Sequence, residues 1–179
     1  MLPWGHAAVG YLCYSLFVRV SDRQPPAGPA VIALAVGTQL PDLIDKPLAW
    51  SLGVLPSGRS LGHSLLFAAV LAVVIWLVAR RYERQREGGA LLLGHLSHVI
   101  ADAIPALISG NWAEAGVLLW PIVPAYQYSD EMDRSIIGFF LELELTALPL
   151  PGVILTILAI GVWILDGRPG LSTLRNTVR

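Results

Sequence analysis

Long apolar runs separated by short polar segments predict membrane-spanning helices. Residues 61–79 carry no formal charge, and the polar segment RRYERQRE follows at once. Runs 90–109 and 145–165 are comparably long, whereas 6–18 and 29–45 are short or interrupted. A helix needs about 20 apolar residues to cross a bilayer. We therefore expect an all-α protein, a polytopic transmembrane helix bundle with about five spans.

The C-terminal third is less regular than the rest of the chain. Pro149 and Pro151 are expected to break the last span near its start, because proline disrupts a helix interior. The segment 136–146 contains Glu142 and Glu144, which favours an interfacial or buried helix. We expect a single membrane-embedded domain over 1–179. Its parts would be a motif-bearing core at 1–125, C-terminal helices at 136–165 and a cytoplasmic tail at 166–179.

Composition supports a membrane protein. The 179 residues are 55% hydrophobic and 14% charged, with a mean hydropathy of +0.63, whereas soluble domains carry about 25% charged residues. A net charge of -1 gives no electrostatic reason to expect nucleic acid as a partner. The N-terminus lacks the basic start and the cleavage site of a signal peptide. We interpret it as a first membrane helix that is retained.

Arginine positions predict the topology in a cell (inner or plasma) membrane. Arginines follow the first, third and last predicted helices, at Arg19 and Arg23, at 80–86, and at Arg168 and beyond. Basic residues in short loops mark the cytoplasmic side. The N-terminus is therefore expected on the outer face and the C-terminus in the cytoplasm.

Ionisable side chains interrupt the apolar runs. Such groups are costly inside a membrane and are usually functional. Under the predicted topology they fall near one outer level of the membrane. Imidazole and carboxylate are the side chains that bind zinc and similar ions. The candidate metal ligands are His6, Asp42, Asp45, His63, His98 and Asp102.

The spacing of these residues places them on shared helix faces. His98 and Asp102 are four residues apart, and Asp42 and Asp45 are three apart, so each pair can lie on one face of a helix. Pro41, between Leu40 and Asp42, favours a bend or an unwound turn there. Arg59 and His63, also four residues apart, can face the same site.

Plainer interpretations remain open for several of these residues. His95 is more typical of a hydrogen-bonded structural histidine than of a ligand. Asp42 could cap a helix, and Asp45 could pair with Lys46 or Arg59. Glu142 and Glu144 are more typical of a polar surface than of a catalytic site.

The ligand types suit Zn²⁺, with Mn²⁺ as an alternative, in one or two ions. Such an ion can lower the pKa of bound water toward 7. An aspartate, for which Asp45 is the candidate, or a second ion would activate the water. Arg59 could bind an anionic group because a guanidinium matches phosphate geometry.

The ordered motifs resemble a known family. They are His6, GTQLPDLID at 37–45, GRSLGHS at 58–64, GHLSHVIAD at 94–102 and LLWP at 118–121. Over roughly residues 1–125 they are similar to the YdjM-type inner-membrane metal-dependent hydrolases, also labelled LexA-binding. The longer runs GTQLPDLIDKPLAW and LPSGRSLGHSL look like haloarchaeal members. More distantly, the family is similar to zinc-dependent phospholipases C and single-strand nucleases, which are all-helical enzymes that cleave phosphodiesters.

The resemblance implies a ligand arrangement. Asp42 or Asp45 would hold one ion together with His63, His98 and Asp102. A second ion would be held by His6, with Asp102 bridging the two. The distant relatives have a further histidine and an H-x-x-x-E element after this region, but no histidine follows His98 here, so a third ion is not expected.

These observations favour a membrane-bound metal-dependent hydrolase that acts on a phosphoester, such as a lipid head group at the level of the bilayer. Two alternatives from other classes remain. A non-catalytic membrane protein with a structural metal would have saturated ligands. A metal or proton transporter would need polar residues through the whole membrane, whereas the inner halves of the predicted helices are nearly all Ala, Val, Leu and Ile.

Overall fold

The computed structural model describes residues 1–128 and 150–177, and within these ranges the chain forms helices and no strand. The elements are α1 (Pro3–Ser21), α2 (Gly28–Lys46), the π-helix η1 (Pro47–Ser51), α3 (Leu65–Arg81), α4 (Gln85–Ser109), α5 (Trp112–Ala115), the 3₁₀ helix η2 (Gly116–Leu119), α7 (Leu150–Leu165) and α8 (Leu171–Thr177). The prediction of an all-α protein is confirmed. The expected helix over 136–146, with Glu142 and Glu144, lies outside the described residues.

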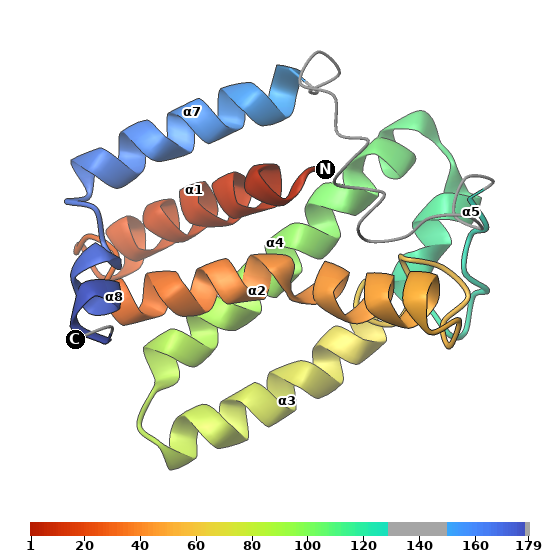
Figure 1. The fold of residues 1–179 in the computed structure, drawn as a ribbon, viewed down its shortest axis with the longest axis horizontal. Coiled ribbons are helices and arrows are strands. Elements are labelled where there is room, and N and C mark those ends of the chain that lie inside the picture. The colour runs from red at the N-terminus through yellow and green to blue at the C-terminus, as the bar shows by residue number, and fades with distance from the viewer. Residues whose placement is uncertain (129–149, 178–179) are drawn as a thin grey trace.

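The long helix α4 organises the bundle. It crosses α2 diagonally and also packs against α1 and α3, while α7 covers the other side of α1 (Figure 1). The last turns of α1, α3 and α7 and the first turns of α2 and α4 gather at one end, on the left of Figure 1. Because arginines follow or precede those turns, we call this the arginine end. It is defined by Arg19, Arg80, Arg84, Arg168 and Arg175.

The helix boundaries differ from the predicted ones in two instructive places. α3 begins at Leu65 and not at residue 61, because the Ser64 side chain accepts a hydrogen bond from the Leu66 amide and caps the helix. α2 continues through Pro41 to Lys46, so of the two alternatives expected at Pro41, a bend or an unwound turn, the unwound turn is wrong. Asp42 therefore lies inside a helix and does not cap one.

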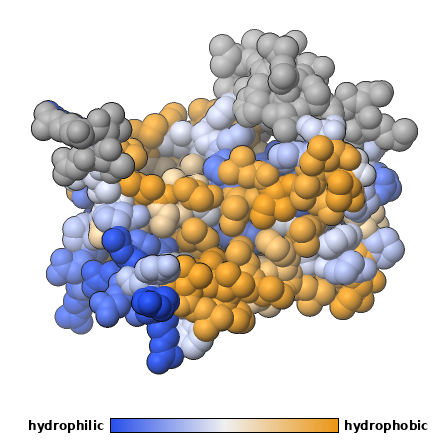
Figure 2. All heavy atoms as spheres, turned by 60° about the horizontal axis from the view of Figure 1, so that its bottom comes forward, coloured by the Kyte–Doolittle hydropathy of each residue, from blue (hydrophilic) through white to orange (hydrophobic). Residues whose placement is uncertain are grey.

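One described helix, α4, is long and apolar enough to cross a membrane, and α7 is a shorter apolar helix. The expected number of about five spans is therefore not confirmed. Many large hydrophobic side chains are nonetheless exposed, among them Val73 and Leu77 on α3 and Ile157 on α7. Figure 2 shows hydrophobic residues over much of one face and hydrophilic residues gathered at one end. Exposed apolar surface of this extent marks an interaction with lipid or protein.

Small residues let α2 and α4 approach at backbone distance. A Cβ atom on Gly37 would overlap the Leu91 carbonyl oxygen, and one on Gly94 would overlap the Leu34 carbonyl oxygen. Small residues at helix contacts are a general device of membrane bundles. The close approach at Gly37 fixes the next turn of α2, which carries Thr38 and Asp42, against the turn of α4 that carries His98.

Candidate metal centre

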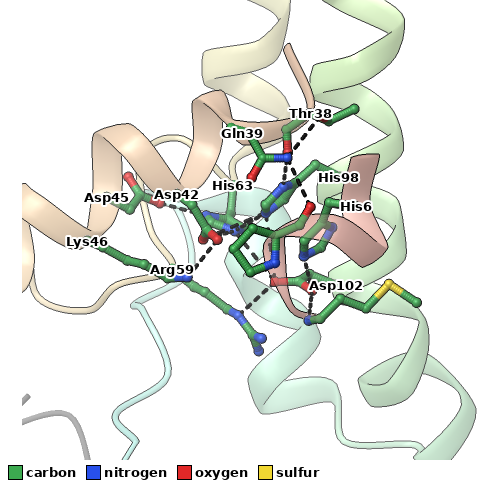
Figure 3. A network of polar contacts seen from close by, with 12 residues as sticks. His6, Thr38, Gln39, Asp42, Asp45, Lys46, Arg59, His63, His98 and Asp102 are labelled. Carbon is green, nitrogen blue, oxygen red and sulfur yellow. Dashed lines mark hydrogen bonds and ion pairs between the residues drawn. The ribbon is translucent and has the colours of Figure 1, made fainter. Parts of the chain in front are cut away.

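Five candidate ligands from four parts of the chain meet at the end of the bundle opposite the arginine end. The first turns of α1 supply His6, the last turns of α2 supply Asp42, and the segment before α3 supplies His63. His98 and Asp102 come from successive turns of α4 (Figure 3). The three histidines are fully buried or nearly so. The structure thus brings together residues that lie almost 100 positions apart.

The orientation of His98 is set by α2. Its Nδ1 lies 2.6 Å from the Thr38 carbonyl oxygen. A carbonyl oxygen can only accept, so Nδ1 carries the hydrogen and Nε2 of the neutral ring presents a lone pair. The ring of His6 stacks on that of His98 with centroids 3.6 Å apart.

His63 is oriented in the same way by Asp45. Its Nδ1 lies 2.8 Å from Asp45 Oδ2, and the two Asp45 oxygens also accept from the Ser60 and Gly62 amides, each at 2.7 Å. With Asp45 ionised, Nδ1 of His63 donates, so Nε2 of the neutral ring presents a lone pair. That Nε2 lies 3.2 Å from Nε2 of His98.

Two carboxylates complete the cluster. Asp42 Oδ1 lies 3.7 Å from Nε2 of both His63 and His98. Asp102 Oδ2 lies 3.7 Å from His63 Nε2 and 3.9 Å from His98 Nε2. The other oxygen of Asp102, Oδ1, faces His6 Nε2 at 3.2 Å. These residues form two groups that could each hold a metal ion. One consists of His6, His98 and Asp102, and the other of Asp42, His63 and His98.

The donor set fits a divalent cation. Two imidazole lone pairs and two carboxylates converge in a buried place where they would repel one another without a positive charge between them. The His6 ring is fully buried, and among the described residues its nitrogens have no polar contact besides the 3.2 Å approach of Nε2 to Asp102 Oδ1, so a nitrogen is available for a ligand bond. Imidazole nitrogen with carboxylate oxygen suits Zn²⁺ or Mn²⁺.

Nearby cationic groups partly offset the negative charge of the two carboxylates. Lys46 donates to Asp42 Oδ2 at 2.6 Å, and the N-terminal ammonium of Met1 donates to Asp102 Oδ1 at 2.7 Å. The aspartate paired with Lys46 is therefore Asp42, and the pairing of Asp45 with Lys46 or Arg59 that the sequence left open is not seen.

Arg59 lies at the edge of the cluster. Its Nε lies 3.1 Å from Asp102 Oδ2, and its Nη1 lies 3.1 Å from the Tyr128 hydroxyl and 3.4 Å from Glu114 Oε1. The Tyr128 hydroxyl donates to the same Glu114 oxygen at 2.8 Å. Arg59 is thus held from two sides, with the Nη2 edge of the guanidinium left without a hydrogen bond to the described residues.

The charge state of this edge follows from its neighbours. Burial opposes the charge on Arg59, but Asp102 and Tyr128 outweigh burial and raise the pKa of the guanidinium above its usual value. Burial raises the pKa of Tyr128 to about 12, although Arg59 acts in the opposite direction. Arg59 therefore remains a cation and Tyr128 a neutral hydrogen-bond donor at any physiological pH.

A comparison of the chain with protein families gives a match over most of its length. A family model described as YdjM inner membrane protein matches residues 1–165. The chain belongs to the YdjM inner membrane protein family. No curated protein and no solved structure matches the chain. The match extends well beyond residue 125 and through the end of α7, so the expectation that the family resemblance stops near residue 125 is wrong.

Family membership supports a membrane location, as the composition predicted, and leaves topology as an expectation. The YdjM family motifs of the sequence correspond to the parts of the centre. PDLID supplies Asp42 and Asp45, and the histidine of GRSLGHS is held by that Asp45. His95 of GHLSHVIAD is buried outside both ligand groups, next to the ring of Phe67.

Two residues of the site were not predicted from the YdjM family motifs or from spacing. Glu114 lies in the short α5, where Asn111 caps the helix and positions the Glu114 amide. Tyr128 lies in the segment that follows η2. An acidic residue in the otherwise apolar stretch 112–120 is a sequence signal that could have drawn attention to Glu114.

Replacing Asp45 with asparagine tests the role that the structure gives it. An amide cannot accept from Nδ1 of His63 and from two backbone amides as a carboxylate does, so the ring loses its fixed orientation. We expect zinc affinity to fall by about 10- to 100-fold while stoichiometry is retained at saturation. Competition against a chromogenic chelator measures both. Complete loss of zinc at saturation would instead make Asp45 a direct ligand.

Proposed function

We propose that the protein is a membrane-bound metal-dependent hydrolase that acts on a phosphoester, such as a lipid head group. The observation that carries this proposal is the convergence of the His63 and His98 Nε2 atoms, 3.2 Å apart, between two carboxylates. A cationic guanidinium touches one of those carboxylates. A cation-binding centre with an arginine at its edge is suited to a phosphoryl group.

The chain's residues divide into ligands and supports. His63, His98 and Asp42 would hold one ion, with Asp102 facing it through Oδ2. His6 would hold a second ion, facing Asp102 Oδ1. Asp102 would then bridge the two. A zinc or manganese ion here would act as a Lewis acid and lower the pKa of bound water.

The remaining polar residues would position the reactants. Asp45 fixes the tautomer and direction of His63, in the manner of a carboxylate behind a metal-binding histidine. Arg59 would bind a phosphoryl oxygen through its Nη2 edge, while Glu114 and Tyr128 hold the other edge still. With its oxygens already engaged, Asp45 is better suited to orienting His63 than to accepting a proton from water.

The position of the centre favours a substrate at the membrane surface. Its residues lie in the first turns of α1, in the last turns of α2 and just before α3, which are the ends of these helices opposite the arginine end. By the positive-inside rule the arginine end would be cytoplasmic, so the centre would face the outer surface at the level of lipid head groups. Zinc is the first choice of metal and manganese the second.

A transporter is less consistent with the described bundle. A permeation path needs polar groups through the thickness of the membrane. From the centre toward the arginine end, the core between α1, α2 and α4 contains Leu34, Ala30, Ala90 and Val18. Asp166, a buried carboxylate toward the arginine end, is already engaged by Tyr11, Ser15 and Arg19 and so offers no open ligand to a passing ion.

The test is hydrolysis by purified protein loaded with zinc or manganese, using bis(p-nitrophenyl) phosphate and a short-chain phospholipid. We expect turnover that a chelator removes. Arg59→Lys should lower kcat/KM by about 100- to 1,000-fold, because lysine cannot replace the forked contact to a phosphoryl group.

Arg80→Lys is the matched control, since Arg80 lies at the arginine end and far from the centre; it should leave turnover unchanged. Full occupancy by metal without hydrolysis of any phosphoester in the panel would contradict the proposed reaction and favour a structural metal site.

A further inference from the structure

A second feature of the molecule lies on the other side of α1. A cavity of about 290 Å³ separates α1, α2 and α7, although α1 and α2 are in tight contact at Gly10 and Thr38. The lining is almost wholly apolar, and Ala35 and Ile160 on its rim are exposed, so the cavity opens to the surroundings. We call it the α1–α7 cavity.

Among the described residues, three of the four polar side-chain groups of the lining, those of Tyr11, Thr156 and Trp163 but not that of Trp4, have hydrogen-bond partners within the chain. The Tyr11 hydroxyl donates to Asp166 at 2.7 Å, the Thr156 hydroxyl to the Gly152 carbonyl at 2.8 Å, and the Trp163 indole to the Pro169 carbonyl at 3.0 Å. A polar occupant would leave its hydrogen bonds with water and gain none from these groups, which is unfavourable. A hydrocarbon occupant loses no hydrogen bonds.

The shape of the cavity suits a chain. Trp4 and Tyr11 line it seven residues apart on α1, and Thr156 and Trp163 do so on α7. At the rise of an α-helix this is about 10 Å. Since a carbon–carbon bond of about 1.5 Å advances somewhat less along an extended chain, about eight carbons span that length.

The two ends of the α1–α7 cavity differ in their surroundings. Trp4 precedes the candidate ligand His6 by two residues, so one end of the cavity lies at the level of the metal centre. At the other end Tyr11 is tied to Asp166, which also accepts from Ser15 and Arg19. A chain that enters from the side of the centre would meet this polar group as a stop.

We propose that the α1–α7 cavity holds one acyl chain of a membrane lipid. The chain's family is an inner membrane family, so lipid is the apolar molecule that surrounds it. The inference rests on the proposed function in one respect: it takes the phosphoester of the same lipid to lie at the metal centre. It names the substrate class of that centre as an acyl-bearing phospholipid.

The experiment maps lipid contacts on the full-length, zinc-loaded protein in nanodiscs that contain a phosphatidylcholine with a diazirine in one acyl chain. After illumination, mass spectrometry locates the labelled residues. We expect labelling of cavity residues on α1 and α7 to exceed by several-fold that of Val73 and Leu77, which are merely exposed on α3. Labelling that is equal at both places would overturn the proposal.

Two variants sharpen the result. Ala35→Trp fills the cavity with an apolar side chain at an exposed position, so labelling in the cavity should fall several-fold while that of α3 persists. Ala69→Trp makes the same change at an exposed position of α3 and should leave cavity labelling intact. Cavity labelling unaffected by Ala35→Trp would also overturn the proposal.

Inorganic phosphate separates this inference from the proposed function. If the head group lies at the metal centre, saturating phosphate should lower cavity labelling and leave that of α3 unchanged. Strong cavity labelling that ignores phosphate, together with no hydrolysis, would uphold the acyl-chain site and contradict the phosphoester function.

Discussion

Replacing His98 with alanine is expected to abolish tight metal binding. His98 belongs to both ligand groups, and its ring stacks on His6 and faces His63. Its loss therefore removes one nitrogen ligand from each group and removes the ring on which His6 stacks. Zinc affinity should fall by more than the about 100-fold that the loss of a supporting residue costs. Chelator competition on detergent-purified protein gives the dissociation constant.

The control for this variant lies one turn earlier on the same helix. His95 is as buried as His98 but belongs to neither ligand group. His95→Ala removes the same side chain from the same helix, so it should leave zinc affinity within a few-fold of wild type. Retention of tight zinc binding by His98→Ala, or equal losses in both variants, would contradict the assigned ligands.

Replacing Gly37 with alanine is expected to destabilise the bundle and to weaken the centre together. The new Cβ would overlap the Leu91 carbonyl oxygen, which belongs to a helix backbone and cannot rotate away. α2 and α4 must then separate, at a cost of about 3 kcal/mol in the free energy of unfolding. Because Thr38 orients His98 across this contact, zinc affinity should fall as well. Thermal unfolding with and without zinc measures both effects.

Gly89→Ala is the matched change, since Gly89 is likewise a glycine within a helix, α4, and has open space where the new methyl group would stand. Alanine favours a helix over glycine by about 1 kcal/mol, so this variant should be neutral or slightly more stable. If Gly37→Ala unfolds at the same temperature as Gly89→Ala and binds zinc as tightly as wild type, the close contact does not shape the centre.

Hydrophobic pattern predicted the helices well because lengthy apolar runs leave few alternatives. It could not fix their ends, which depend on single capping contacts such as that of Ser64 with Leu66. Nor could it show that Pro41 is accommodated within α2, because a proline in a helix interior is tolerated or not according to the packing around it. By length and hydropathy, α4 alone among the described helices qualifies as a membrane span, which is fewer than the about five expected.

The sequence predicted six metal ligands, and the structure brings five of them together, namely His6, Asp42, His63, His98 and Asp102. The sixth, Asp45, lies behind His63. Spacing alone could not distinguish Asp42 from Asp45 as a metal ligand. The difference between them comes from the turn at Ser60 and Gly62, whose amides occupy the oxygens of Asp45, and no periodicity reports such a contact.

Glu114 and Tyr128 illustrate the part of a site that spacing cannot reveal. They reach Arg59 from a short helix and from the segment after η2, over 55 and 69 positions of sequence. Their partnership depends on the path of the chain beyond α4, which carries no repeat or periodic pattern. Family motifs did not include them either.

The most direct test of the central claim is the metal content of wild-type protein, purified in detergent without chelator and measured by inductively coupled plasma mass spectrometry. The two ligand groups predict one or two equivalents of zinc or manganese per chain, and X-ray absorption at the metal edge should show nitrogen and oxygen ligands without sulfur. Metal-free protein that takes up neither ion on reconstitution would contradict the assignment of a metal centre.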